Sequence, residues 1–305
     1  MINNIKKLLK SNANSHIFFL YVKNTIAKLE CIFISDERAI KKKYYSVHKK
    51  ELNLKNPILF NEKIQWLKLN YRKKALTLCA DKYAVREYVS NILGDDVLNE
   101  LYGVYNDVNE IDFNSLPKEF VLKVTHGSGQ NLITQNKESI DWAYEKKQLN
   151  FYMHSNHYLE GREWVYKNIP PRIICEKYLD ENGKPPVDYK FFCFNGEPRF
   201  IQLDLDRFDS HKRNMYDTNW NALPFEFQHQ RDLADFERPK CLELMLTYAQ
   251  KLAGDFPFAR VDFYLVNGKI IFGEITFHPE QGLGRFIPES YNMMLGKQLN
   301  LPVKG

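Results

Sequence analysis

The chain lacks the cysteine pattern of a disulfide scaffold or a zinc site. Its five cysteines are an odd number, lie far apart in the sequence and form no CxxC pair. Small secreted domains and structural zinc sites both depend on closely spaced cysteines. We therefore expect reduced thiols in a cytoplasmic protein, where most of the cysteines fill the core.

Long apolar runs are also missing, although the N-terminal region contains two short ones. Lys23, Lys28 and Glu30 interrupt the apolar stretches 17–22 and 31–34, so no run approaches the ~18 residues of a transmembrane helix. No small-residue cleavage site follows, which argues against a signal peptide. We expect helices that pack on the main body or, as the alternative, a basic amphipathic segment that touches the inner membrane surface.

Strong charge, repeats and low-complexity linkers are absent as well. The net charge of +5 comes from 43 basic and 38 acidic residues without an arginine-rich tract, so nucleic acid is not an indicated partner. A chain of 305 residues with 44% hydrophobic content predicts two or three closely packed globular domains. The mild positive balance is compatible with anionic ligands such as nucleotides or acidic sugars.

The periodicity of the sequence predicts a mixed α+β chain. Residues 35–89, 141–154 and 228–256 are predicted to be largely helical. Strands dominate from residue 187 onward, and Asn195-Gly196 and Asn267-Gly268 are typical hairpin turns.

A first candidate for chemistry is a lysine that precedes a glycine-bearing turn. Lys123 lies at the end of a predicted strand, shortly before Gly127-Ser128-Gly129. Backbone N–H groups of such a turn can approach phosphate oxygens, and the ammonium can contact the same phosphate. The motif is neither a Walker A loop nor a dinucleotide fingerprint, and a plain hairpin turn is the alternative.

Two further groups of charged residues lie on predicted strands. Glu176 ends one strand, where backbone groups could pair with an adenine edge, and Asp188 opens the next; a solvated strand end is the alternative. Asp262 and Glu274 interrupt apolar strands on either side of Asn267-Gly268. Buried carboxylates need a cation, so we predict either magnesium, with Arg260 nearby for a phosphoryl group, or a structural Arg260-Asp262-Glu274 ion network.

In this order the motifs resemble those of the TupA-like ATP-grasp family, which occurs among bacterial capsule and surface-polysaccharide proteins. The resemblance covers about residues 60–302 and is carried by FNEKIQWLKL, ADKYAVREYV, FVLKVTHGSG, IICEKYL, DYKFFCFNGEP, IQLDLDRF, FARVDFYLVNGKIIFGEITFHPEQG and Leu295-Gly296. It implies an α/β ATP-grasp fold with a helical N-terminal region. The implied divisions are an N-terminal segment (1–59), a helical region before the ATP-grasp core (60–119), a lid subdomain (120–180) and a central subdomain with the metal site (181–305).

The resemblance also implies roles for single residues, with ATP and Mg²⁺ as cofactors. The implied nucleotide contacts are Lys82 as the first basic position, Lys123 at the α- and β-phosphates, Gly127, Ser128 and Gly129 in the closing loop, Glu176, Lys177 and Leu179 in the hinge that holds adenine, and Asp188 at the ribose. Lys190 corresponds to a second lysine near the triphosphate, and Arg260 to the arginine that stabilises the transferring phosphoryl group. Asp262 and Glu274 correspond to the magnesium ligands.

One position departs from the pattern of many ATP-grasp ligases. They have asparagine two residues after the metal-binding glutamate, whereas this chain has Thr276. Threonine is a weaker neutral ligand, so a second magnesium would depend on Thr276, His278 or water.

The resemblance implies a cytoplasmic carboxylate–amine ligase that works through an acyl phosphate and joins an amino acid or another amine to a uronic acid of a surface polysaccharide or its precursor. Arg207 or Arg213 would bind the acceptor carboxylate and His211 would take the amine proton, with a structural salt-bridge network as the alternative. Its partners would be small-molecule or glycan substrates, with peripheral contact to the inner membrane or the capsule assembly machinery as a further option. A sugar or glycan kinase, a polysaccharide glycosyltransferase and a non-enzymatic scaffold remain alternatives.

Overall fold

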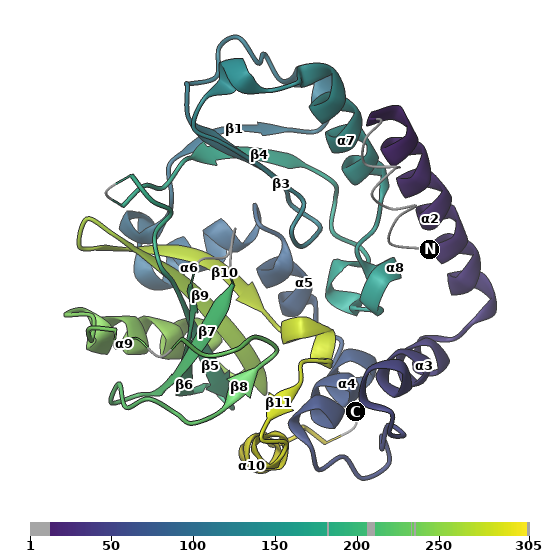
Figure 1. The fold of residues 1–305 in the computed structure, drawn as a ribbon, viewed down its shortest axis with the longest axis vertical. Coiled ribbons are helices and arrows are strands. Elements are labelled where there is room, and N and C mark those ends of the chain that lie inside the picture. Colours follow the sequence, from purple (N-terminus) through teal and green to yellow (C-terminus); the bar gives the residue numbers. More distant parts are fainter. Residues whose placement is uncertain (1–12, 182, 206–210, 233, 235, 304–305) are drawn as a thin grey trace. The chain divides into compact units, whose positions relative to one another are not determined.

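The computed structural model describes residues 13–181, 183–205, 211–232, 234 and 236–303. The chain divides into two compact units (Figure 1). Unit 1 comprises residues 1–39, 81–83 and 100–178, and unit 2 comprises residues 40–80, 84–99 and 179–305. Within the described part of the chain, none of the helices combines the length and the apolar character needed to cross a lipid bilayer.

Unit 1 is built on a four-stranded antiparallel sheet with the strand order β1-β4-β2-β3. Its strands are β1 (Leu101–Tyr105), β2 (Phe120–Val124), β3 (Asn131–Thr134) and β4 (Ile173–Lys177). Its helices are α2 (Ala13–Phe33), α7 (Trp142–His154), α8 (Tyr158–Gly161) and the 3₁₀ turns η2 (Val108–Glu110), η3 (Lys137–Ser139) and η4 (Trp164–Tyr166). Alternate side chains of β2, namely Phe120, Leu122 and Val124, pack with Leu149 of α7 in one buried cluster.

Unit 2 is built on a five-stranded antiparallel sheet with the strand order β10-β9-β5-β6-β7. Its strands are β5 (Asp188–Phe194), β6 (Glu197–Leu205), β7 (Lys212–Asp217), β9 (Phe258–Val266) and β10 (Lys269–Thr276), and β8 (Glu226–Phe227) pairs separately with β11 (Phe286–Ile287). Its helices are α3 (Asp36–His48, which begins in unit 1), α4 (Phe60–Asn70), α5 (Lys74–Ala80), α6 (Val85–Leu93), α9 (Leu242–Ala253), α10 (Ser290–Gln298) and the 3₁₀ turns η1 (Asp95–Val97) and η5 (Pro279–Gly282).

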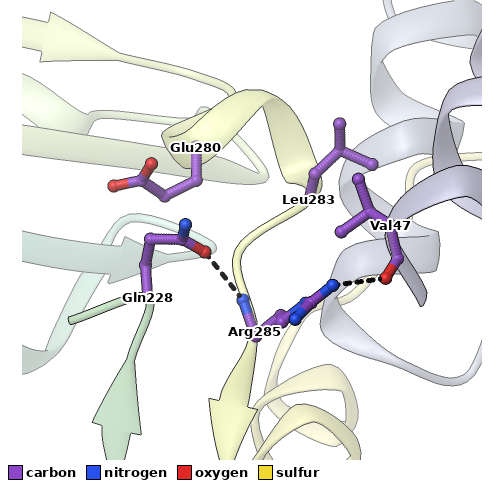
Figure 2. Close-up of a pocket in the computed structure, with 5 residues that line it drawn as sticks. All are labelled: Val47, Gln228, Glu280, Leu283 and Arg285. Atoms are coloured by element: carbon purple, nitrogen blue, oxygen red, sulfur yellow. Dashed lines mark hydrogen bonds between the residues drawn. The ribbon is translucent and has the colours of Figure 1, made fainter. Parts of the chain in front are cut away.

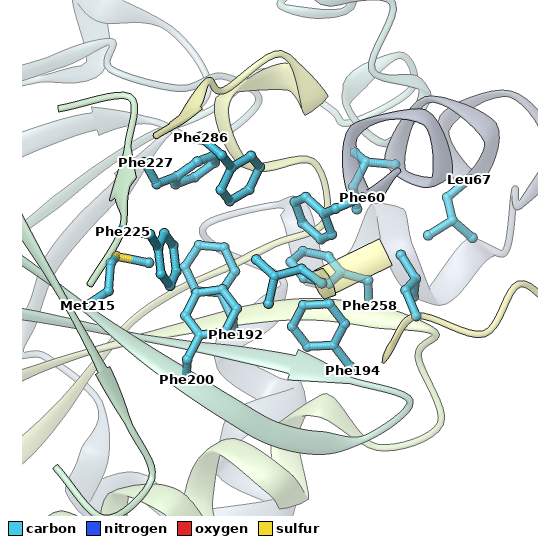
Figure 3. Close-up of a cluster of buried hydrophobic side chains, with 13 residues drawn as sticks. Phe60, Leu67, Phe192, Phe194, Phe200, Met215, Phe225, Phe227, Phe258 and Phe286 are labelled. Carbon is cyan, nitrogen blue, oxygen red and sulfur yellow. The ribbon is translucent and has the colours of Figure 1, made fainter. Parts of the chain in front are cut away.

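Phenylalanine rings form the main core of unit 2 (Figure 3). Phe192 and Phe194 of β5 and Phe258 of β9 lie on the face of the sheet that Phe60 of α4 covers, and the ring centroids of Phe60 and Phe258 are 5.3 Å apart. The opposite face packs on α9, where the Cys193 thiol lies near the carbonyl oxygen of Ala249. The aromatic cluster therefore fills one end of one sheet face and leaves the other end of that face to different side chains.

Both predicted hairpins form. Asn195 and Gly196 connect β5 to β6, and Asn267 and Gly268 connect β9 to β10, each with positive φ at both turn residues. Positive φ at two successive positions is what the type I′ turn requires, and Asn-Gly supplies it with little strain.

The prediction of one helix over residues 228–256 is wrong in its first half. Helix α9 begins only at Leu242, and none of the described residues between 228 and 239 is helical. Pro239 precedes the helix by three residues, and its ring and missing N–H prevent a helix from continuing through it.

We predict that Gly296→Ala destabilises unit 2 by about 1–3 kcal/mol, because helices α10 and α4 touch at this position. A Cβ atom there would lie 2.1 Å from the carbonyl oxygen of Ile58 and 2.8 Å from the backbone nitrogen of Phe60, and backbone atoms cannot move aside easily. Chemical denaturation should show a lower midpoint with an unchanged slope. The exposed neighbour Lys297→Ala is the control, and an equal loss in both variants would contradict this account.

Candidate active site

Charged side chains occupy the end of the sheet face that the phenylalanine cluster leaves open. Lys190 pairs in register with Asp262 of β9, and Asp188 pairs with Asp204 of β6. Residues two apart on a strand share a face, so Asp188 and Lys190 lie on the same side as Phe192. The sequence alternation thus builds one sheet face with an aromatic half and an ionic half.

A β-bulge brings Glu274 onto this charged face. In an uninterrupted hairpin, Glu274 would lie opposite Val261, on the other side of the sheet. The register shifts between Phe272 and Glu274, so that Glu274 pairs with Asp262 instead and Gly273 is the extra residue. A Cβ atom on Gly273 would lie 3.0 Å from the carbonyl oxygen of Asp262, which explains why glycine suits the bulge.

Arg260 connects the two carboxylates that were predicted to bind magnesium. Its guanidinium donates to both oxygens of Asp262, at 2.8 Å from Nε and 2.7 Å from Nη2, and Nη2 also lies 3.0 Å from Oε1 of Glu274. The hydroxyl of Thr276 accepts from Arg260 at 3.1 Å and donates to Glu274 at 2.9 Å. The structure therefore contains the Arg260-Asp262-Glu274 network that the sequence offered as the alternative to a metal site.

Lys190 extends the network toward the centre of the sheet. Its ammonium lies 2.8 Å from Asp262 Oδ2 and 3.7 Å from Asp204 Oδ2, and it donates to Asp188 at shorter range. Burial by itself would lower the pKa of Lys190, but Asp188 and Asp262 outweigh it and raise the pKa above its usual value. Burial, with Asp188 adding to it, also raises the pKa of the Asp262 carboxyl, while Arg260 and Lys190 oppose the change.

Arg213 of β7 completes the network at its far end. Its Nε donates to Asp204 Oδ1 at 2.7 Å, and its Nη1 donates to the carbonyl oxygen of Phe227 at 2.9 Å and to Glu280 at 3.0 Å. Gln202 donates to Asp204 at 3.0 Å. Arg213 is almost wholly buried and already bound on several sides, so it belongs to the salt-bridge network and does not present an open clamp for an acceptor carboxylate.

The described side chains of the network carry charges of both signs. Its described carboxylates are Asp188, Asp204, Asp262, Glu274 and Glu280, and its described cations are Lys190, Arg213 and Arg260. Buried carboxylates are costly unless they are paired or bind a cation.

The donors present suit a partial magnesium site. Asp262 is buried, whereas the side chain of Glu274 is 37% exposed and can be reached from solvent. Magnesium is commonly held by one or two carboxylates together with waters and phosphate oxygens. Among the described residues, no three or more His, Cys, Asp or Glu side chains are grouped to hold a metal ion, so the described donors are two carboxylates and a hydroxyl.

In unit 1, the lysine predicted at the phosphates is paired with a predicted hinge residue. Lys123 of β2 lies 2.6 Å from Glu176 of β4, and the pair joins neighbouring strands. Glu176 is buried while Lys123 remains partly exposed. Lys177 is exposed, and its ammonium lies 3.4 Å from Glu100. The division between the units falls between Tyr178 and Leu179, within the segment predicted to be a hinge.

The glycine-bearing turn of unit 1 is held at its base by Lys82, which is half-buried, next to the buried His126. The ammonium of Lys82 donates to the carbonyl oxygen of Gly127 at 2.8 Å, and Gly129 adopts a φ of +72°, which glycine accommodates without strain. His126 is buried with Nε2 at 3.1 Å from the carbonyl oxygen of Tyr152, and burial lowers its pKa. Lys82 and the turn are thus in contact, and Ser128 and Gly129 at the tip are exposed.

His211 lies beside the network and Arg207 lies outside the described residues. The imidazole Nε2 of His211 is 3.2 Å from Asp204 Oδ1, and its ring lies 3.8 Å from that of His229, centroid to centroid. Burial, with Arg213 and His211 adding to it, lowers the pKa of His229.

Next to the network is a polar pocket that the sequence did not predict (Figure 2). It has a volume of about 400 Å³ and is lined by Val47, Gln228, Glu280, Leu283 and Arg285. Arg285 donates to the carbonyl oxygen of Val47 at 2.8 Å, and its backbone N–H lies 3.3 Å from the Gln228 side-chain oxygen. Within the described part of the chain, no carboxylate pairs with the Arg285 guanidinium, which leaves it available to an anion.

The backbone around this pocket is strained. Gln228, Glu280 and Gln281 have φ values of 66°, 50° and 58°, a region that residues other than glycine seldom adopt. Such residues cluster at functional sites. In the sequence, only the segment Pro279-Glu280-Gln281-Gly282 indicates a turn near this pocket. That segment does not predict positive φ at Glu280 and Gln281.

The family model described as TupA-like ATPgrasp matches residues 62–300. The chain belongs to this family. The predicted resemblance and the predicted ATP-grasp fold are therefore confirmed, and the predicted ligase class and the cofactors ATP and Mg²⁺ agree with the family. The polysaccharide substrate has no such support. No curated protein matches the sequence.

Solved structures of ATP-grasp ligases share parts of the fold of this TupA-like protein. The ATP-grasp ligase PsnB in complex with a minimal precursor is 8% identical, with 67% of this chain and 53% of that chain covered and a TM-score of 0.36. D-Alanine-D-alanine ligase from Helicobacter pylori is 14% identical, with coverages of 79% and 69% and a TM-score of 0.42. N5-carboxyaminoimidazole synthase from Aspergillus clavatus is 13% identical, with coverages of 66% and 44% and a TM-score of 0.35. The chain spans about half the length of the first of these structures. These likenesses are too distant to carry an argument about activity.

We predict that Lys190→Met lowers the free energy of unfolding by about 3–5 kcal/mol, because Asp188 and Asp262 would lose the buried cation between them. The matched control is Lys212→Met on β7. The Lys212 side chain is 43% exposed, and its ammonium lies 3.0 Å from Asp232. Loss of this exposed ion pair should lower the free energy of unfolding by less than about 1 kcal/mol. Urea denaturation of both variants measures the difference. Similar decreases in the free energy of unfolding of the two variants would show that the buried ion pairs of Lys190 are no more stabilising than an exposed one.

Proposed function

We propose that this TupA-like protein is an ATP-dependent carboxylate–amine ligase. The observation that carries the proposal is the contact of Arg260 with both Asp262 and Glu274 on paired strands, inside the range matched by the family. These residues supply a cation for phosphate oxygens and carboxylates for magnesium in one place. We assign Asp262, Glu274 and Thr276 to the magnesium, which would neutralise phosphate charge when bound.

The reaction that fits this arrangement has two transfers. A carboxylate oxygen attacks the γ-phosphorus of ATP, the bond to ADP breaks, and an acyl phosphate forms. An amine nitrogen then attacks the acyl carbon, phosphate leaves, and the amine loses a proton. Positioning and charge stabilisation supply most of the rate in such transfers. Arg260 would stabilise the phosphoryl oxygens, with Lys190 supporting it through Asp262.

Residues of unit 1 would bind the nucleotide phosphates. Lys123 and the turn of Gly127, Ser128 and Gly129 present an ammonium and backbone N–H groups, and Lys82 fixes the turn through its contact with Gly127. Glu176, Lys177 and Leu179 would hold the adenine by backbone groups. Asp188 was predicted at the ribose, but its contact with buried Lys190 better supports a role in holding that lysine.

The pocket beside Glu280 and Arg285 supports a charged substrate. The Arg285 guanidinium, which has no carboxylate partner among the described residues, favours a carboxylate group, and the partly exposed Glu280 favours an amine. This fits an amino acid or a uronic acid of a surface polysaccharide or its precursor, the substrate class that the resemblance suggested. His211, on the other side of Arg213, would take the proton from the amine. We place the enzyme in the cytoplasm, with peripheral contact at the inner membrane surface.

We predict that Glu274→Gln lowers turnover by ~10²-fold or more while the fold stays intact, because a charged ligand is lost with little change in volume. Mass spectrometry of uronic acid and amine pairs incubated with ATP would first identify a substrate pair. Glu197→Gln, at the exposed start of β6, is the matched control and should retain full activity. A fully active Glu274→Gln variant with normal stability would assign Glu274 to the structural network alone.

The acyl phosphate predicts a specific transfer of label. With a carboxylate labelled with ¹⁸O, one labelled oxygen should appear in the released phosphate, because the C–O bond breaks when the amine attacks. Arg260→Lys, which keeps a cation beside Asp262 but loses the bidentate geometry, should lower kcat far more than it weakens ATP binding. Label retained wholly in the organic product, or release of AMP, would exclude this route, and a phosphorylated product would indicate a kinase.

A further inference from the structure

Helix α2 of unit 1 is apolar on the side that faces away from its neighbours. Its inward side packs on α7 and α8: Ile17 is buried, the Tyr21 ring meets the Phe151 ring edge-on at 5.0 Å, and His16 lies 2.8 Å from the Tyr144 hydroxyl. Its outward side exposes large apolar side chains, from 40% for Val22 to 79% for Phe33. These side chains, named here the outward face, are Phe18, Val22, Ile26, Leu29, Ile32 and Phe33.

The outward face is one continuous stripe. At 3.6 residues per turn its six side chains fall within a sector of roughly 120°, and the centre of this sector lies about 120° from Ile17. Helices that are apolar all round are normally buried on all sides. Contiguous exposed apolar surface of this kind marks a binding surface in a folded protein.

Positive charge borders the stripe. Lys28 lies at one margin and Lys23 at the other, and both are exposed; Lys23 lies 3.8 Å from the partly exposed Glu160, and Glu30 is exposed on the same margin as Lys23. Residues 1–33 contain five lysines and one glutamate, so they hold four of the five net positive charges of the whole chain. Two copies of such a face would bring like charges together, which disfavours self-association. A membrane of anionic lipids offers acyl chains to the apolar stripe and negatively charged head groups to the lysines.

We infer that the outward face of α2 docks on an anionic lipid bilayer, with the helix lying in the plane of the interface. Phe18 and Phe33 would enter the boundary between head groups and acyl chains, and Lys23 and Lys28 would reach the anionic head groups with their flexible stems along the apolar surface. The ligase would thereby work at the membrane. This surface involves none of the residues assigned to catalysis and requires no nucleotide.

Flotation of the full-length protein with vesicles tests the inference. The protein should float with vesicles of phosphatidylglycerol and phosphatidylethanolamine, stay behind with phosphatidylcholine alone, and be released by high salt, because each lysine at an anionic surface strengthens binding about fivefold. Leu29→Gln should weaken binding about tenfold, since a leucine side chain no longer enters the apolar layer. Lys28→Glu should weaken binding to the anionic vesicles by about fivefold or more.

A matched control separates the outward face from general exposed apolar surface. Leu244→Gln on α9 makes the same change at a side chain of similar exposure, 46% against 51% for Leu29, and should leave flotation unchanged. Circular dichroism confirms that both variants fold. Absence of flotation, equal binding to phosphatidylcholine, or equal loss in the two glutamine variants would overturn the inference. A dimer in sedimentation without lipid that Leu29→Gln converts to a monomer would assign the face to a second copy instead.

Discussion

The contact of Arg260 with Asp262 and Glu274 is the interaction on which the rest of unit 2 depends. Three ionised groups are placed beside an apolar core, where each alone would be expensive to desolvate. The contact is tolerable only because the guanidinium satisfies both carboxylates at once, with its planar donors aligned to the two oxygens of Asp262. Lys190 and Arg213 also each pair with more than one carboxylate, and Asp204 and Asp262 each pair with two cations. The ionic half of the face is therefore a continuous series of ion pairs.

The division of one sheet face into an aromatic and an ionic half follows from this constraint. Phe192 and Lys190 are two residues apart on the same strand, so the core that fixes β5 also fixes the lysine. Groups held this way need little reorganisation when charge develops nearby, which is the condition for electrostatic catalysis. The aromatic cluster therefore contributes rigidity to the site. One of its members, Phe227, also contacts the network, because the Arg213 guanidinium lies 5.6 Å from the centroid of the Phe227 ring.

Some of this could be predicted from the sequence and some could not. The hairpins at Asn195 and Asn267 follow from local turn chemistry, and they pair β5 with β6 and β9 with β10; the pairing of β5 with β9 is long-range and does not follow from them. The partnership of Asp262 and Glu274 was predicted, but its cause was not: it depends on a bulge at Gly273, and a one-residue shift in pairing would reverse the face of Glu274. The pocket depends on positive φ at Gln228 and Glu280, conformations that long-range packing imposes and local propensity opposes.

Each unit holds its predicted phosphate-binding cation against a carboxylate: Arg260 against Asp262 and Glu274, and Lys123 against Glu176. A triphosphate without a metal would have to compete with these carboxylates for the cations. Its binding would leave the carboxylates without a cationic partner. Under the proposed function, a triphosphate that arrives with magnesium would avoid this cost, because Arg260 would turn to phosphate oxygens while Asp262 and Glu274 would keep a positive partner. On the proposed assignments, nucleotide and magnesium would bind together, because the metal would replace Arg260 as a partner of Asp262 and Glu274.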